Sequence, residues 1–442
     1  MKKSQEKERE FKGEITAFLA LIFILILSLT GALLESASIQ IAKTRKRADT
    51  LLALESVFAQ YQKELLEDYD IFGYQNQSEG ALLNQLAYYG AKNMNHSMEK
   101  VEYLTDEKGA PFYRQAVTYA KSILGISEAP MEELEPGFQT EEEEKEIDES
   151  VTEELEAMLK QEDAELPTEN NPIAAVETLK NTGLLTLVMP KDKEVSNRSV
   201  EPDYLPSVRE LQKGNYGTSY KGSVTDRVFF LTYLTEHFGN ATKEKDSESL
   251  LYEQEYLLEG KSTDAANLES VCKKILNIRM AANYVYLLTD AQKQAEAETM
   301  AAALCSLLTV PAITQLAKQA ILLAWAYGES IVDVRVLLQG KRVPAVKTAE
   351  TWQLQLSSVV KMGTPEEDVK ECDVSKGLSY NDYVRGFLLL EEESVLCMRS
   401  LDLIECNLGI KVDSCVTRLQ LKSTAFMRRG IRYTFTTKFG YQ

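Results

Sequence analysis

Residues Ile15–Leu34 (ITAFLALIFILILSLTGALL) form an apolar run of twenty residues without a charge. At 1.5 Å per residue such a helix spans roughly 30 Å, the thickness of a hydrocarbon core. Because a backbone in lipid must satisfy its own hydrogen bonds, the run predicts a retained transmembrane helix that contacts membrane lipid. A cleaved secretory signal is the alternative, although its apolar region is usually about 7–15 residues long. Ser36-Ala37-Ser38 would then be the cleavage site.

The basic residues around this run do not decide its orientation. Five of them lie before it and four lie after it, so the positive-inside rule favours neither side. A short tail (residues 1–14) in the cytoplasm and a large C-terminal body outside the cell is the expected arrangement.

The segment after the run predicts a helical stalk over residues 35–73. Neither proline nor glycine occurs between Glu35 and Tyr69, and Gly73 is the expected stop. Alternating steps of three and four residues separate the apolar side chains of a seam: Leu51, Leu54, Phe58, Tyr61 and Leu65. This spacing fits either packing on the protein's own body or contact with a partner helix.

The N-terminal part resembles the TadE/TadG-like proteins of tight-adherence (Flp) pilus systems. The similar stretch is Lys12–Ala20, then the apolar run, then Ser36–Asp49 and Leu54–Val57. Members of that family have a short basic start, a glycine, one span and an amphipathic helix beyond it. The resemblance implies a membrane-anchored component of pilus machinery, with other pilus-system proteins as partners.

The larger body resembles an uncharacterised group of exported proteins encoded with such pilus systems in Gram-positive bacteria. The stretches that carry this resemblance are Glu255–Ser262, Ile278-Arg279, Leu322–Ser330, Asp333–Arg335 and Val343–Lys347. The resemblance implies no catalytic residues.

Prepilin-type processing would place Gly13 before the cut and Glu14 after it. Pilins of the wider class usually carry a glutamate five residues after the cut, where this sequence has Phe18. The sequence therefore departs from the pilin pattern at that position.

Charge is concentrated in one segment of the chain. The formal net charge is −19, which argues against a nucleic-acid binder. Residues 131–170 contain 17 acidic residues and two lysines, which leaves −4 for the rest. Dense like charge disfavours a compact core, so we predict a flexible, solvated insertion with a short helix at Thr152–Leu159. Calcium binding or docking of a basic partner is the alternative interpretation.

The remaining body is predicted to be helix-rich, divided into residues 74–130 and a main domain of residues 171–442. Residues 171–222 are rich in proline and glycine and predict loops, and Leu250–Leu258 is a candidate strand. Hydrophobic periodicity predicts helices over Ala81–Met98, Pro111–Leu124, Asp226–Gly239, Asp264–Thr289, Ala291–Leu308, Ala312–Leu338 and Tyr380–Leu408.

The C-terminal part alternates with period two over Lys411–Leu421 and again over Ile431–Phe439, with Gly430 between. This pattern predicts an antiparallel hairpin or the edge of a small sheet. The expected fold class is therefore α+β.

One pair of carboxylates has a spacing that would suit a catalytic or cation-binding site. Glu329 and Asp333 are four residues apart and lie on one face of a predicted helix, as acid/base chemistry or cation binding requires. An exposed pair, or one neutralised by Arg335 or Lys341, is the competing interpretation.

The other motifs indicate no stronger candidate for a catalytic or ligand-binding site. Gly214–Gly222 resembles a phosphate loop but lacks its spacing and its Lys-Ser/Thr ending, so no nucleotide is expected. The six cysteines permit three disulfides, and no Cys-x-x-Cys occurs. His96 and His237 are the only histidines, which leaves little for a histidine-based metal site, and spacing does not exclude a cysteine nucleophile paired with either of them.

Together these features predict a non-enzymatic, single-pass protein of the cytoplasmic membrane without a cofactor or metal. It would act by protein contacts in a tight-adherence pilus or a related secretion system. A membrane-tethered cell-surface hydrolase and an anchored adhesin or sensor are the alternatives.

Overall fold

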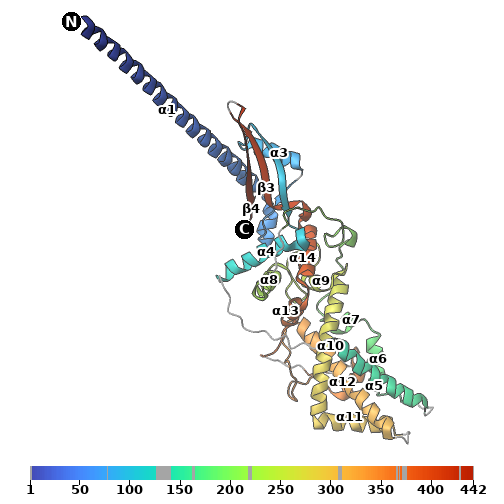
Figure 1. Ribbon diagram of the computed structural model, residues 1–442. Helices are drawn as coiled ribbons and strands as arrows, with labels where there is room; N and C mark the ends of the chain where they lie inside the picture. Colours follow the sequence, from blue (N-terminus) through green and yellow to red (C-terminus); the bar gives the residue numbers. More distant parts are fainter. Residues whose placement is uncertain are drawn as a thin grey trace.

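The chain forms an elongated molecule in which a long helix, a small sheet and a helical body follow one another (Figure 1). The computed structural model describes residues 2–76, 78–125, 141–161, 165–217, 222–306, 311–364, 367, 369–370, 376–427 and 430–441. Side chains are described from residue 15 onward, except for residues 141–149 of the fifth helix.

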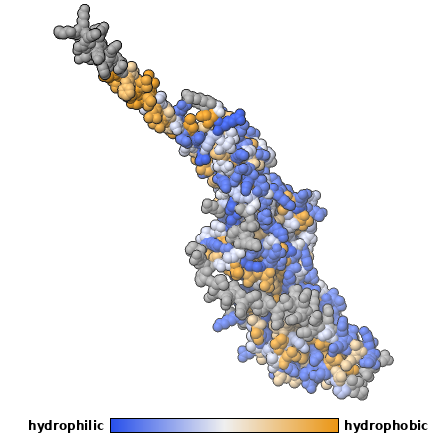
Figure 2. Space-filling view, in the orientation of Figure 1, coloured by the Kyte–Doolittle hydropathy of each residue, from blue (hydrophilic) through white to orange (hydrophobic). Residues whose placement is uncertain are grey.

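Helix α1 (Lys2–Phe58) combines the predicted span and most of the predicted stalk. Its apolar part projects away from the body and forms an exposed apolar sleeve (Figure 2). The prediction of one continuous helical stalk over residues 35–73 is wrong, because α1 ends at Phe58 and α2 (Lys63–Tyr69) follows after a turn. Phe58 packs against Tyr74, Phe439 and Tyr441, so the chain turns where α1 meets the sheet.

The seam along the stalk packs on the protein's own body. Leu54, Phe58 and Leu65 are buried, while Leu51 and Tyr61 stay partly exposed. Gly73 is not a helix stop. A Cβ atom there would lie 3.0 Å from Cys415 Cβ, so the glycine permits close packing against the sheet.

The sheet confirms the predicted C-terminal hairpin, formed by β3 (Cys415–Phe426) and β4 (Arg432–Gly440). On the other side of β3 lies β2 (Met94–Tyr103), and the short β1 (Tyr74–Gln75) pairs with the start of β3; every pairing is antiparallel. Helix α1 and helix α3 (Glu79–Tyr88) are packed around the apolar cluster of this sheet.

Strand β2 overturns part of the predicted helix Ala81–Met98. That helix ends at Tyr88, and the chain then extends to pair with β3. Met94 lies opposite Ala425 and Met98 opposite Leu421, so the partner that stabilises the extended form is more than 300 residues away. Residues 74–103 and the main domain therefore share one sheet.

The body next to the sheet is helical. The candidate strand Leu250–Leu258 is instead a buried helix, and the predicted helix Tyr380–Leu408 is interrupted at Glu391-Glu392. The helices of this part are α4 (Asp106–Leu124), α8 (Val224–His237), α9 (Glu253–Glu259), α13 (Tyr380–Leu390) and α14 (Glu393–Leu408).

The distal part confirms the predicted helices α10 (Asp264–Thr289), α11 (Ala291–Leu304) and α12 (Pro311–Leu338), with residues 307–310 outside the described ranges. The loop prediction for residues 171–222 is wrong where α6 (Pro172–Lys180) and α7 (Leu184–Val188) pack against this part. Three short 3-10 helices complete the described elements: Pro202–Tyr204, Leu356–Lys361 and Val412–Ser414.

Residues 141–161 of the acidic segment form helix α5 (Glu141–Gln161), where the sequence predicts a flexible, solvated insertion with only a short helix. The expected short helix Thr152–Leu159 is thus the end of a longer one, packed against α12. Val151, Leu155, Met158 and Leu159 form an apolar stripe at helical spacing that contacts the main core. Residues 131–140 and 162–164 lie outside the described residues.

Candidate functional site

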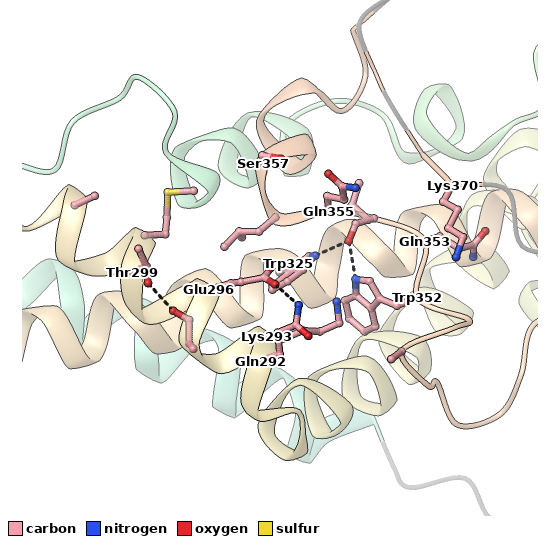
Figure 3. A pocket seen from close by; sticks show the side chains of 16 residues that line it. Gln292, Lys293, Glu296, Thr299, Trp325, Trp352, Gln353, Gln355, Ser357 and Lys370 are labelled. Atoms are coloured by element: carbon pink, nitrogen blue, oxygen red, sulfur yellow. Dashed lines mark hydrogen bonds between the residues drawn. The ribbon is translucent and has the colours of Figure 1, made fainter.

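A cleft of about 900 Å³ opens in the distal body between α11 and the segment 349–357 (Figure 3). Its floor is aromatic, and amide and hydroxyl side chains surround it. The residues that line it include Lys293, Trp325, Trp352, Gln353, Leu354 and Lys370.

The floor is built by the two tryptophans of the chain. Trp325 on α12 meets Trp352 edge to face, with ring centroids 5.7 Å apart. Both indole N–H groups donate to the carbonyl oxygen of Leu354, at 2.9 Å from Trp325 and 2.6 Å from Trp352 (Figure 3). Shared hydrogen bonding to one carbonyl fixes both rings to the segment that follows them.

Lys293 covers this aromatic floor. Its ammonium nitrogen lies 4.5 Å from the Trp325 ring centroid and 4.8 Å from that of Trp352, so both rings attract the cation. Burial lowers the pKa of Lys293, while Glu296, Asp290 and Glu329 favour its charged form. Lys370 lies near the far side and donates its backbone N–H to the carbonyl of Gln353.

Directly behind the cleft lies a buried charge network that contains the predicted carboxylate pair. Glu329 and Asp333 are both 0% exposed, so the expectation of an exposed pair is wrong. Lys347 Nζ lies 2.5 Å from Glu329 Oε1 and 2.7 Å from Asp333 Oδ1. Arg279 Nε lies 3.0 Å from Asp333 Oδ2.

The expected partners Arg335 and Lys341 do not neutralise the pair. Arg335 binds Glu367 at 2.6 Å and the carbonyl of Leu187, and Lys341 is exposed. Two acidic and two basic side chains give the network no net charge, which is the condition under which buried charges are tolerated.

Hydrogen bonds connect the network to the floor of the cleft. Glu329 accepts the backbone N–H groups of Gln353 (3.0 Å) and Leu354 (2.8 Å), and the Gln353 side chain reaches Asp333 at 3.4 Å. Burial raises the pKa of Glu329, and Lys347 opposes that rise. The arrangement holds the segment 352–354 in place and leaves neither carboxylate facing the cleft, because both are fully buried.

Sequence spacing indicated the carboxylate pair but missed Arg279, Lys347 and the tryptophan floor. Arg279 lies on α10 and Lys347 in the loop after α12, so only tertiary packing brings them to α12. All four charged residues of the network lie in the stretches that carry the resemblance to exported pilus-associated proteins.

The histidines have separate structural partners. His96 in β2 lies 2.8 Å from Ser423 Oγ, and His237 on α8 stacks on Tyr233 and contacts Asp70 at 3.1 Å. Among the described residues, no group of three or more histidine, cysteine or acidic side chains is arranged to hold a metal ion. Of the glycine-rich stretch, Gly214 donates its N–H to Asp106, and residues 218–221 lie outside the described ranges.

The five cysteines that the structure describes are free thiols: Cys272, Cys305, Cys397, Cys406 and Cys415. Burial raises the pKa of each, to about 11 for Cys406 and about 12 for Cys415. A protonated thiol is a poor nucleophile, so these residues fit packing roles. Cys372 lies outside the described residues.

Residues 162–426 match a family described as a family of unknown function (DUF5702). The chain belongs to the DUF5702 family. The part matched to DUF5702 includes the cleft, the charge network and strand β3, and it excludes α1. No curated protein and no solved structure matches the chain.

The cleft gives a direct optical prediction. Replacing Lys293 with alanine uncovers the indole rings, so tryptophan emission is expected to move to longer wavelength and acrylamide quenching to increase. Because the chain has two tryptophans, both in the cleft, emission reports this site alone. Lys318→Ala, which removes an ion pair to Glu298 elsewhere on α12, is the matched control and should leave the spectrum unchanged. Equal spectra for both variants would contradict the covering role of Lys293.

Proposed function

We propose that this chain is a membrane-anchored, non-catalytic component of a tight-adherence pilus or a related secretion system, acting through protein contacts outside the cell. The observation that carries the proposal is the exposed apolar part of α1. Its side chains are open to the surroundings from Ile15 (56% exposed) to Leu34 (73%), with a mean hydropathy of 2.7 in the most apolar window. A twenty-residue apolar sleeve that the fold leaves uncovered fits a lipid environment.

The continuity of α1 supports an anchor that also positions the body. The same helix that carries the sleeve buries one face between Thr50 and Phe58 against the sheet, where Ala53, Leu54 and Val57 are 0% exposed. A signal sequence that is cleaved would leave this buried part as the new N-terminal helix, so the two alternatives predict different chain masses.

The non-catalytic part of the proposal rests on how the chemical groups are used. Glu329 and Asp333 each contact a basic side chain and face the protein interior rather than the cleft. Acid/base catalysis needs a carboxylate that reaches a substrate. The pilus assignment itself rests on the resemblance of residues 12–57 to TadE/TadG-like proteins and of the body to proteins encoded with such systems.

A second candidate function is supported by the cleft. It lies in the part of the body that is farthest from α1, where a ligand outside the membrane would have access (Figure 1). An aromatic floor with surrounding amide and lysine groups is typical of a small binding site. An anchored adhesin or sensor is therefore the alternative that this feature favours.

Membrane retention is the first test of the anchor. The full chain is expected to stay in the membrane fraction after alkaline carbonate extraction and to dissolve only in detergent. Combining Leu21→Arg with Leu25→Arg should release it, because each arginine at the centre of a span costs about 2.5–3.5 kcal/mol. Ile41→Arg is the matched control, since Ile41 is an exposed apolar residue of α1 beyond the span.

The intact mass of the extracted protein separates a retained span from a cleaved signal. A wild-type chain of full mass that is freely soluble would contradict the anchor. The pilus assignment has its own readout, the proteins that co-purify in a detergent extract. If none belongs to a pilus or secretion system, that assignment fails while the anchor can still stand.

A further inference from the structure

The β3–β4 hairpin runs beside α1 toward the apolar sleeve (Figure 1). At the far end of the sheet, Phe439 and Tyr441 pack on Phe58. Near the hairpin turn, the cations of Lys43 and Arg47 lie 5.2 Å and 5.5 Å from the Tyr433 ring centroid. Strand β4 therefore runs parallel to α1, and its N-terminal end at Arg432 is directed toward the span.

Standard helix and strand geometry gives the distance of this end of the sheet from Leu34, the last residue of the span, along the axis of α1. Lys43 is nine residues beyond Leu34, or about 14 Å along the helix axis at 1.5 Å per residue. Gly430 and Ile431 lie three and two residues before Tyr433, which brings them about 7–10 Å closer to the span at roughly 3.3 Å per strand residue. The described residues at this end of β4 thus lie within about 10 Å of Leu34 along the axis of α1, near the polar headgroup layer beside a hydrocarbon core.

The side chains at this level combine apolar and cationic groups. Phe426 is 52% exposed, and the Arg432 guanidinium lies 5.8 Å from its ring centroid. Residues 36–48 of α1 contain four basic residues and no acidic one. One of them, Lys46, donates to the carbonyl of Lys92 and so joins the loop before β2 to the same end of the sheet.

This composition is opposite in sign to the strongly acidic chain as a whole. Exposed aromatic rings and long basic side chains are the groups that a membrane interface accepts, because the ring and the alkyl stems enter the apolar boundary while the charges meet headgroups. Basic segments next to a span are attracted to anionic lipid within a Debye length of the surface.

We propose that this end of the sheet, formed by Phe426, Arg432 and the basic residues of α1, rests on the anionic headgroup surface of the membrane that α1 crosses. This second contact restricts how the elongated body tilts on its single helix. The proposal rests on the membrane anchor proposed above and adds a lipid-binding surface to it.

Depth-dependent quenching in the full chain tests the proposal. Phe426→Trp adds one indole at the hairpin, while the native tryptophans lie buried in the distal cleft. The protein is reconstituted in vesicles of phosphatidylcholine and phosphatidylglycerol that contain lipids brominated on the acyl chain. We expect loss of the emission that the added indole contributes, and a smaller loss in vesicles of phosphatidylcholine alone.

Val285→Trp is the matched control, because Val285 is a 60% exposed residue of α10 in the distal body. Equal quenching of the two added indoles in the mixed vesicles would overturn the proposal and would leave this end of the sheet free for a protein contact. Equal quenching of Phe426→Trp in both lipid mixtures would overturn its anionic specificity.

Charge reversal at Arg45, an exposed basic residue of α1, supplies a second readout. Arg45→Glu combined with Phe426→Trp should lower the quenching in mixed vesicles and leave it unchanged in phosphatidylcholine. Failure of the anchor is distinguishable from these results, because the chain would then not float with vesicles of either composition.

Discussion

Replacing Lys347 with methionine is expected to destabilise the distal body by about 3–5 kcal/mol, because it leaves a buried carboxylate without its cation. The Lys347 ammonium group contacts both Glu329 and Asp333, and all three side chains are 0% exposed. Methionine keeps most of the side-chain volume, so the loss reports charge rather than a cavity. The network then changes from neutral to a net charge of about −1 in a site closed to water.

Urea unfolding in mild detergent, followed by tryptophan emission, measures this effect where it occurs. Both tryptophans lie in the cleft in front of the network, so their signal reports unfolding of the distal body. Lys341→Met is the matched control, because Lys341 is exposed on the same segment and should change the free energy of unfolding by about 0.5 kcal/mol or less.

A double variant separates the buried charge from the loss of contacts. Lys347→Met combined with Glu329→Gln restores a neutral network, in which the carbonyl of the introduced side-chain amide can still accept the N–H groups of Gln353 and Leu354. It should therefore recover a large part of the stability that Lys347→Met alone loses. A double variant no more stable than the single one would contradict the electrostatic explanation.

The stability of the Lys347→Met variant should also depend on pH, in a direction that can be checked. Burial already raises the pKa of Glu329 in the native chain, and removal of Lys347 takes away the main opposing influence. The folded variant then binds a proton more tightly than the unfolded chain, so its stability rises as pH falls. The deficit relative to wild type should be smaller at about pH 5 than at about pH 8.

Local patterns predicted the distal helices well. The boundaries of α10 agree with the predicted Asp264–Thr289, because the periodic apolar spacing, the cap at Thr263 and the following Asp290 all lie within one segment. The C-terminal hairpin was predictable for the same reason, since its two strands are neighbours in sequence.

Elements that depend on distant partners were not predictable in this way. Strand β2 extends because β3 lies beside it, and the local sequence alone favoured a helix. The sequence did not predict the full helix α5, because its dense acidic charge indicated a flexible segment. The apolar stripe that includes Leu155 was the signal for a packed helix. In the site, the i and i+4 spacing indicated Glu329 and Asp333, whereas Arg279 and Lys347 carry no spacing signal relative to them.

Replacing Trp325 with alanine is expected to cost about 3–5 kcal/mol, the usual range for removing a buried aromatic side chain. Trp325 is 0% exposed, and its loss would open a cavity between α12 and Trp352. It also removes one of the two N–H donors to the Leu354 carbonyl. Urea unfolding followed by the emission of the remaining Trp352 measures the change, with circular dichroism as an independent signal.

Trp325→Phe is the matched control, because it keeps an aromatic ring and removes the N–H. Since Trp352 still donates to Leu354 at 2.6 Å, the phenylalanine variant should lose only about 1–2 kcal/mol. A Trp325→Ala variant no less stable than Trp325→Phe would show that the ring does not support the cleft.

Coupling between this floor and the charge network can be measured in the same experiment. The backbone N–H of Leu354 binds Glu329 while its carbonyl accepts both indoles, so one residue connects the two groups. Trp325→Ala frees the segment 352–354 and thereby weakens the amide contacts that Lys347→Met also disturbs. The combined variant should therefore be destabilised by less than the sum of the single changes. Strict additivity would mean that the cleft and the network are energetically independent, so that a ligand in the cleft would not sense the buried charges.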